Sequence, residues 1–392
     1  MPDFLWGAAA SAHQYEGNNV NSDWWWLESQ GAMERSGAAV DGYHRYADDM
    51  RLLADAGLNA FRFSLEWARI EPAQGEFAAA ELIHYRRMID TALSLGLTPV
   101  VTLLHFTHPR WFIEKGGWRN PQAVGHFARY VEKVTAILGD VEWVCTINEP
   151  NIHTLTARMM ERLAAGEQVP PISAGPGARL PLPDPEIGAV LADAHATARD
   201  IVRARTRAQA GWTVACRALT PTPGNEERFA EVKYHWEDFY LEQAKGDDFV
   251  GVQAYTSQPV DADGVVPHPP SPTNTLTGWA FRPDALGIAI RNAADVTRGT
   301  PIVVTENGIA TDDDKRRVQY IDEALGTLFD ATDDGIDIRG YLHWSATDNF
   351  EWGHWAPTFG LIGVDRTTLA RTPRPSLSRL GDIARGGYRH AT

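Results

Sequence analysis

The amino-acid sequence predicts one (β/α)8 barrel over residues 1–392, and three observations support this fold class. Short apolar or β-branched runs alternate with longer segments of helical period, which is the pattern of repeated β-α units around a parallel sheet. Eight such strand-like runs occur, the number that closes this kind of barrel. A single barrel takes roughly 200 to over 400 residues, so a chain of 392 residues needs no second domain.

The expected strands are short runs rich in aliphatic and aromatic residues. They lie at Phe4–Ala8, Ala60–Leu65, Thr98–Leu104, Trp143–Ile147, Trp212–Arg217, Phe249–Tyr255, Ile302–Thr305 and Gly340–Trp344. Glycine marks the change from helix to strand in Ala56-Gly57-Leu58 and again in Leu95-Gly96-Leu97. This repeated arrangement supports the register of the first two β-α units.

The expected helices lie between these strands, and several begin at Pro or Asp and end near Gly, as helix termini do. They lie at Tyr43–Ala56, Ala79–Leu95, Pro121–Leu138, Pro185–Ala208, Pro283–Thr297, Asp313–Ala331 and Ser376–Ala384. Two Pro- and Gly-rich stretches, Val169–Pro185 and Val260–Pro283, are too short to link separately packed domains. We interpret both as loops of the barrel.

Composition excludes several classes of protein. Hydrophobic residues make up 44% of the chain and charged residues 22%, as in a globular protein with a large core. The formal net charge of −15 argues against nucleic acid as a partner, because a phosphate backbone requires clustered Lys and Arg. The sequence contains no run of about 18 apolar residues, so we expect no membrane span.

Cysteine usage and the N-terminal residues favour a cytoplasmic enzyme. Cys145 and Cys216 each lie in a strand-like run, which predicts buried thiols and not a disulfide framework. The segment Met1–Ala10 lacks the basic region and the long apolar core of a signal peptide. The sequence gives no indication of the oligomeric state.

Polar and aromatic residues end most of the expected strands. In a barrel of this type the chemistry takes place at the carboxyl ends of the strands, because the βα loops form that rim. The residues at those ends are Arg62, His105, Asn148, Glu149, Tyr255, Glu306, Asn307 and Trp344. They are the candidates for an active site.

Two of these residues are carboxylates at the ends of apolar strands, Glu149 in Thr146–Pro150 and Glu306 in Ile302–Gly308. At the edge of a low-dielectric core, burial and a like charge can give two acids different protonation states. Double-displacement hydrolysis of a glycosidic bond needs such a pair. One carboxylate attacks the sugar carbon, and the other protonates the leaving oxygen and later deprotonates water. From the spacing alone, two rim carboxylates in salt bridges explain the pattern equally well.

The segments around these carboxylates resemble motifs of the family 1 glycoside hydrolases, the retaining β-glucosidase and β-galactosidase family. Thr146–Pro150 is similar to the acid/base motif of that family, and Thr305–Gly308 is similar to its nucleophile motif. Further similar segments follow in the family's order along nearly the whole chain: Phe4–Gly7 through Gln14–Gly17, Phe61–Ser64, Leu103–Phe106, and Trp344 through Asp348–Trp352. The resemblance implies a (β/α)8 TIM barrel that hydrolyses β-glycosides and needs no metal and no organic cofactor.

The resemblance also implies a role for each candidate residue. Glu306 would be the nucleophile and Glu149 the general acid/base, while Arg62 and Tyr255 would flank Glu306 and keep it ionised and oriented. The residues that would bind the sugar are Gln14, His105, Asn148, Glu351 and Trp352 through hydrogen bonds, and Trp344 through stacking. The expected partner is a small-molecule or oligosaccharide β-glycoside.

Some of these residues have a simpler explanation when they are taken one at a time. Gln14, His105 and Trp344 fit core positions with satisfied hydrogen bonds. The spacing of His105 and His108 is that of a metal-binding pair, but no Cys and no obvious third ligand is near, so we expect no metal. The run Trp24–Trp26 fits core packing and the wall of an outer subsite equally well.

The sequence departs from the family pattern near the expected site. Val252-Gln253-Ala254-Tyr255 stands where the family usually has Asn-Tyr-Tyr, which alters the surroundings of the nucleophile. Phe106 and Thr107 replace the usual Trp-Asp pair after His105. These changes leave the aglycone and the choice among glucose, galactose and fucose open. A catalytically silent sugar-binding protein and a transglycosidase that uses an acceptor other than water are the alternatives.

Glu351 predicts a preference for unphosphorylated sugars. By the resemblance it would accept hydrogen bonds from O4 and O6 of the sugar, where a 6-phosphate would meet a like charge. Family members that take 6-phospho sugars replace this Glu with a small residue and add a Lys nearby. The stretch Gly353–Gly360 contains no Lys or Arg.

Overall fold

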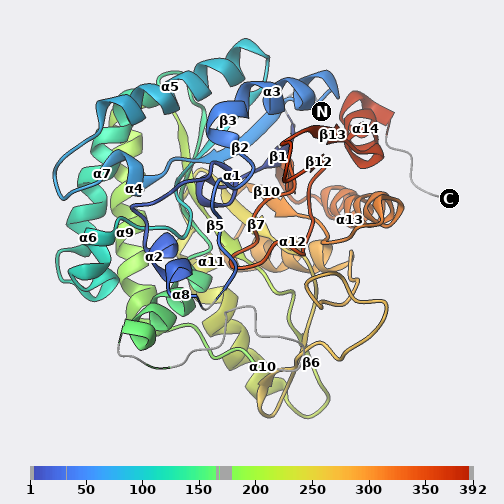
Figure 1. The fold of residues 1–392 in the computed structure, drawn as a ribbon. Coiled ribbons are helices and arrows are strands. Elements are labelled where there is room, and N and C mark those ends of the chain that lie inside the picture. Colours follow the sequence, from blue (N-terminus) through green and yellow to red (C-terminus); the bar gives the residue numbers. More distant parts are fainter. Residues whose placement is uncertain (1–3, 32, 165–166, 168–178, 388–392) are drawn as a thin grey trace.

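The structure is a computed structural model that describes residues 4–31, 33–164, 167 and 179–387. Parallel strands close into a barrel in the order β1-β11-β10-β7-β5-β4-β3-β2, and helices surround it (Figure 1). The barrel strands are β1 Leu5–Ala9, β2 Ala60–Ser64, β3 Thr98–Leu104, β4 Trp143–Asn148, β5 Gln209–Ala215, β7 Val250–Gln253, β10 Ile302–Asn307 and β11 Ile338–Trp344. The predicted fold class is confirmed, since each predicted strand forms one strand of the barrel.

The predicted helices are all present in the outer layer. They are α3 Gly42–Asp55, α5 Ala79–Ser94, α7 Ala123–Leu138, α9 Pro185–Arg205, α12 Ala285–Thr297, α13 Asp314–Asp333 and α14 Pro375–Asp382. The start of α9 shows why these segments fold locally. Asp184 Oδ1 accepts hydrogen bonds from the backbone N–H groups of Glu186 and Ile187 at 3.0 and 3.1 Å, and Pro185 occupies the first helical position.

Several other elements were not predicted from the sequence. They are helices α1 Ala12–Tyr15, α2 Asp23–Ser29, α4 Trp67–Ile70, α6 Arg110–Glu114, α8 Pro150–Ala164, α10 Glu226–Lys233 and α11 Phe239–Gln243, and strands β6 Thr220–Pro221, β8 Pro259–Asp261, β9 Gly264–Val265, β12 Ile362–Val364 and β13 Arg371–Pro373. The longest of these helices, α8, begins directly after Glu149. Pro150 is compatible with that start, because the first helical residue needs no N–H donor.

The bounds of β5 differ from the prediction. The strand spans Gln209–Ala215, whereas the sequence predicted Trp212–Arg217. Its early start follows from the hydrogen bond between the Gln209 N–H and the Glu142 carbonyl oxygen at 2.8 Å. It ends early because the Arg217 N–H donates to Glu237 Oε1 at 2.8 Å, away from the barrel. Cys216 therefore lies just beyond the strand, and both cysteines are buried free thiols as predicted.

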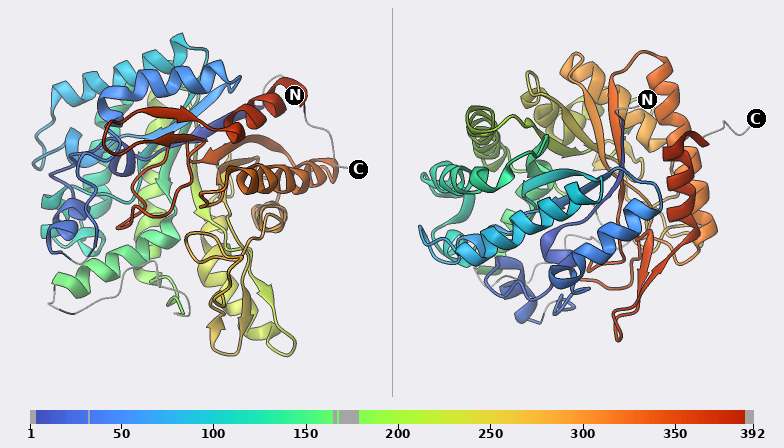
Figure 2. Two further views of the ribbon diagram at one scale, coloured as in Figure 1. Left: turned by 45° about the vertical axis from the view of Figure 1, so that its right-hand side comes forward. Right: turned by 90° about the horizontal axis from the view of Figure 1, so that it is seen from above.

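The two stretches predicted as loops are partly described. Of Val169–Pro185, residues 169–178 lie outside the described residues, and residues 179–184 contain neither helix nor strand. The stretch Val260–Pro283 contains an antiparallel pairing of β8 with β9. Together with α10 and β6 this pair extends beyond the ring of helices (Figure 2). In the described part of the chain, no helix is both long and apolar enough to span a membrane.

Aliphatic and aromatic residues fill the inside of the barrel. One hydrophobic cluster takes residues from six of the barrel strands and from the position just before β7: Leu5, Ala60, Val100, Trp143, Cys145, Phe249, Val303 and Leu342. Only the barrel interior can bring such residues into contact, so this cluster closes the bottom of the barrel. The polar residues near the carboxyl ends of the same strands therefore rest on a rigid, dry support.

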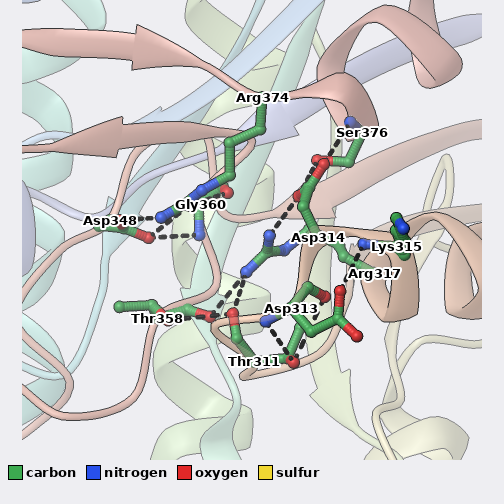
Figure 3. Close-up of polar contacts among 10 residues, drawn as sticks. All are labelled: Thr311, Asp313, Asp314, Lys315, Arg317, Asp348, Thr358, Gly360, Arg374 and Ser376. Carbon is green, nitrogen blue, oxygen red and sulfur yellow. Dashed lines mark hydrogen bonds and ion pairs between the residues drawn. The ribbon is translucent and has the colours of Figure 1, made fainter.

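A polar network anchors the loop between β11 and β12, which carries Glu351 and Trp352 (Figure 3). Arg374 forms two parallel bonds with Asp348, from Nη1 to Oδ1 at 2.8 Å and from Nη2 to Oδ2 at 2.6 Å. At the far end of the loop, the buried Arg317 donates to the Thr358 carbonyl oxygen at 3.0 Å. The loop is thereby fixed at both ends against α13 and the segment leading to α14.

We expect Arg374→Met to lower the melting temperature, because Asp348 would retain its charge without a cationic partner. Arg374 and Asp348 are 22% and 15% exposed, so the loss should be about 1–3 kcal/mol, between the values for surface and buried pairs. Arg379→Met is the matched control, since Arg379 pairs with Asp322 at 2.8 Å and both are more exposed. Equal effects of the two substitutions in thermal melts would contradict this role of Arg374.

Candidate active site

A cavity of about 510 Å³ lies at the carboxyl ends of the barrel strands, a volume within the usual range for small-molecule sites. The predicted site residues that line it are His105, Glu149, Tyr255, Glu306, Trp344, Glu351 and Trp352. The others, Gln14, Arg62 and Asn148, are buried and interact with residues that line the cavity. The structure thus brings together all the predicted site residues.

Glu306, at the end of β10, is 4% exposed and receives three hydrogen bonds. Arg62 Nη1 and Gln253 Nε2 donate to Oε1 at 2.6 and 2.9 Å. Tyr255 OH donates to Oε2 at 2.5 Å. Burial raises the pKa of the Glu306 carboxyl, whereas Arg62, Tyr255 and Gln253 act against that shift because each stabilises the carboxylate. Both carboxylate oxygens are therefore held in a fixed orientation.

Gln253 is a direct partner of Glu306 that the sequence did not predict as a site residue. Besides Glu306, its Nε2 contacts Asn148 Oδ1 at 2.9 Å and Thr213 Oγ1 at 3.1 Å. The sequence suggested only that Gln253 alters the surroundings of the nucleophile. Its position two residues before Tyr255 in the strand predicted at Phe249–Tyr255, where alternate residues share a face, is the signal that could have identified it.

Glu149 has a different environment from Glu306. Its φ of 43° lies in the left-handed region, which non-glycine residues seldom adopt, and its N–H donates to the Thr213 carbonyl oxygen at 2.7 Å. Its carboxyl accepts no hydrogen bond from any residue that the structure describes. Burial raises the pKa of the Glu149 carboxyl well above its usual range, and the charge of Glu306 raises it further. Of the two acids, Glu149 is therefore the one that retains its proton.

Asn148 and His105 offer buried polar atoms toward a ligand. Asn148 Oδ1 accepts hydrogen bonds from Arg62 Nη2 at 2.5 Å, Thr213 Oγ1 at 3.1 Å and Gln253 Nε2. These bonds fix the amide, and within the described ranges its Nδ2 has no acceptor. Burial lowers the pKa of His105 well below its usual range, so the ring is neutral, and its Nδ1 also lacks a described partner. Because buried polar groups are normally paired, a hydroxyl-rich ligand fits this position.

Glu351 and the two indoles beside it form a further wall of the cavity. Trp344 Nε1 donates to Glu351 Oε1 at 3.0 Å. Burial raises the pKa of the Glu351 carboxyl to about 8, although hydrogen bonds from Trp344 and Gln14 act in the opposite direction. The Trp352 ring stacks on His13, with 5.8 Å between ring centroids and an interplanar angle of 7°. This packing fixes the Trp352 side chain.

The structure places Trp24, whose role the sequence left open, and His108, whose spacing from His105 is that of a metal-binding pair. Trp24 is buried in a hydrophobic cluster with Leu27 and also lines the cavity. It therefore belongs both to the packed core and to the cavity wall. His108 Nδ1 lies 2.8 Å from Asp23 Oδ2, and its Nε2 receives a hydrogen bond from Trp118. Both nitrogens are thus used within the protein. The described residues contain no group of three or more His, Cys, Asp or Glu suited to a metal ion.

A (β/α)8 barrel whose rim holds two carboxyls of unequal acidity beside buried hydroxyl-binding groups defines an enzyme of the glycosidase class. Residues 1–247 and 245–386 match the model of Glycosyl hydrolase family 1, and the chain belongs to that family. It is a glycoside hydrolase of the β-glycosidase type. The alternatives of a silent sugar-binding protein and a transglycosidase are not favoured by this result.

Individual relatives agree with the family. The chain is 32% identical over 440 residues to thermostable β-glucosidase B of Thermobispora bispora, covering 98% of this chain and 90% of the relative. The apo structure of β-glucosidase 1317 has 41% identity and a TM-score of 0.86, with 98% and 99% of the two chains covered. A β-glycosidase from Pyrococcus horikoshii has 34% identity and a TM-score of 0.88, with 99% and 95% covered.

Proposed function

We propose that this enzyme removes a terminal β-linked glucose or a related sugar from a small glycoside, with retention of the β configuration. Glu306 is the nucleophile and Glu149 is the general acid/base. The observation that carries this assignment is the contrast between the two carboxyls. The Glu306 carboxyl is held by three donors that stabilise its ionised form, whereas the Glu149 carboxyl accepts no described hydrogen bond and has the more strongly raised pKa. The β-glucosidase names of relatives support glucose as the sugar.

In the first step, Glu306 attacks the anomeric carbon and forms a glycosyl ester while the glycosidic C–O bond breaks. Glu149 transfers its proton to the departing oxygen, so the aglycone leaves as a neutral alcohol or phenol. Arg62 stays bonded to one oxygen of Glu306, which leaves the other oxygen free to attack once Tyr255 yields its hydrogen bond. In the second step, Glu149 takes a proton from water, and the water oxygen displaces Glu306 from the same face as the original bond.

The sugar is held by the residues that surround this pair. Asn148 Nδ2 and His105 Nδ1 bind hydroxyls, because both are buried without another described partner. Trp344 lies beneath the sugar ring, while Gln14, Glu351 and Trp352 bind further hydroxyls. The proposed location is the cytoplasm, which the two free buried thiols support.

The stereochemistry of the first product tests this function. Hydrolysis of p-nitrophenyl β-glucoside followed by NMR should give the β anomer of the sugar first, with the α anomer appearing later by mutarotation. A panel of aryl β-glucosides, β-galactosides and β-fucosides at one concentration should rank glucose first. Release of the α anomer as the first product would refute double displacement, and no turnover of any aryl β-glycoside would refute the function.

Glu351 should select against a phosphate on the sugar. The charged groups that most affect its pKa, Glu306 and Asp348, are both acidic, so a 6-phosphate bound there would meet like charge and no cation among them, even when Glu351 is protonated at its raised pKa of about 8. We expect wild-type kcat/KM to be at least about 100-fold higher for an aryl β-glucoside than for its 6-phosphate, the size of a few kcal/mol of electrostatic mismatch. Glu351→Ser should narrow that gap. A wild-type preference for the phosphate would overturn the assignment of Glu351.

A further inference from the structure

One wall of the cavity lies outside the proposed sugar site and carries an arginine. Arg217 follows β5 and lines the cavity together with Ile152, Leu155 and Val265. These apolar residues belong to, or pack against, a hydrophobic cluster that includes Trp236. The Arg217 guanidinium lies over the Trp236 ring, 5.1 Å from its centroid. The cavity therefore continues from the sugar site to an apolar wall that contains one cation.

Arg217 has no carboxylate partner in the described part of the chain. Residues 165–166 and 168–178, which the structure does not describe, contain no Asp or Glu. Its Nη2 donates to Gln258 Oε1, but its Nε is a buried donor without an acceptor among the described residues. Burial lowers the pKa of Arg217 to about 10, with Glu237 and Glu149 acting against the shift. A partly desolvated guanidinium without a carboxylate in direct contact is costly, which indicates that a ligand supplies one.

The charges that face the cavity make this arginine distinctive. Among the described residues that line it, Arg217 is the only Lys or Arg, while Glu149, Glu306 and Glu351 are all acids. An anion bound elsewhere in the cavity would meet these acids without a compensating cation. Arg217 therefore defines the one described place in the cavity that favours a negative group.

We propose that the natural substrate has a largely apolar aglycone bearing a carboxylate, which pairs with the Arg217 guanidinium. This inference rests on the proposed function, because it assumes that the sugar lies between Glu149 and Glu306. The apolar body of the aglycone packs on Ile152, Leu155 and Val265. The carboxylate then accepts charge-assisted hydrogen bonds that Arg217 does not make within the protein.

Two matched substrates test the pairing: 4-carboxyphenyl and 4-carbamoylphenyl β-glucoside, which are alike in size and differ in charge. The carbamoyl phenol is the better leaving group. Without a contact between the aglycone and Arg217, the neutral carbamoyl substrate should therefore react faster. We expect the wild-type ratio of kcat/KM, carboxylate over carbamoyl, to exceed about ten, mainly through KM. Arg217→Met should lower that ratio at least about tenfold, because it removes one partner of a desolvated charge pair. Arg217→Lys should retain part of the preference.

Arg228→Met is the control, since Arg228 lies on α10, pairs with Glu231 at 2.7 Å and does not line the cavity. Its ratio should equal that of the wild type. A wild-type ratio of one or less, or a ratio that Arg217→Met leaves unchanged, would overturn the proposal. If neither substrate were hydrolysed, the proposed function would fail instead. In that case, calorimetry would still test the arginine site by comparing the affinities of the enzyme for 4-hydroxybenzoate and 4-hydroxybenzamide. Equal affinities would overturn the arginine site.

Discussion

Glu306→Gln is expected to reduce kcat by about 10⁴–10⁶-fold toward every aryl β-glycoside, the scale seen when a covalent nucleophile is removed. The amide has the size of the carboxyl and can still bond to Tyr255, but it cannot form the glycosyl ester. Because the loss lies in the chemical step, KM should change little. The measurement is p-nitrophenol release from p-nitrophenyl β-glucoside, with circular dichroism to verify that the variant is folded.

A mechanism-based label identifies the nucleophile independently of mutation. A 2-deoxy-2-fluoro β-glucoside with a good leaving group should glycosylate the wild-type enzyme on the peptide that contains Glu306, with loss of the aglycone, as read by mass spectrometry. Glu66→Gln is the matched control for the Glu306→Gln substitution. Glu66 is also a buried carboxylate just beyond a barrel strand, but it bonds Thr107 at 2.7 Å and does not line the cavity. A label on any other residue would refute the assignment of Glu306.

The barrel could be predicted from sequence because every β-α unit repeats the same local signals. The run Thr98–Leu104 forms β3 with the predicted bounds, the other predicted runs overlap their strands, and Asp184-Pro185 marks the start of α9. The helix α8 was not predicted because it begins directly after Glu149, with no turn to separate it from β4. The strands β6, β8 and β9, which lie beside α10, were not predicted because each is only two or three residues long.

The contacts of Glu306 were predictable in part. Arg62 and Tyr255 were expected beside it, and both bond its carboxylate. The contact with Gln253 was not, because a longer amide in place of the usual Asn gave no indication of which acceptor it would reach. Only the closed barrel shows that Asn148, Thr213 and Glu306 all lie within reach of its Nε2.

Arg217 shows the limit of a motif-based prediction. Nothing in the sequence around it marks a site, and its importance arises from what surrounds it in space. Its N–H donates to Glu237, β5 has already ended at Ala215, and the Arg217 side chain lines the cavity. That an arginine there lacks a carboxylate partner depends on the positions of acids in distant segments, which no local pattern reports.

Glu149→Ala is expected to slow the enzyme to a degree that depends on the leaving group. An alkyl glycoside needs protonation of the departing oxygen, so its kcat/KM should fall by about 10²–10⁴-fold, the usual contribution of a general acid. A 2,4-dinitrophenyl glycoside leaves without a proton, so formation of its glycosyl-enzyme should be much less affected. Equal losses for both substrates in steady-state assays would refute the role of Glu149 as the acid.

The second step and the pH profile complete the test of Glu149. Without a base to activate water, the glycosyl-enzyme should accumulate, and azide, which needs no deprotonation, should restore turnover and give a β-glycosyl azide.

Wild-type kcat/KM should fall at high pH, because Glu149 must be protonated and its pKa is raised by burial and by Glu306. It should fall at low pH as Glu306 becomes protonated. In Glu149→Ala the alkaline limb should disappear for dinitrophenyl substrates while the acidic limb remains, and an unchanged bell-shaped profile would assign the proton to another group.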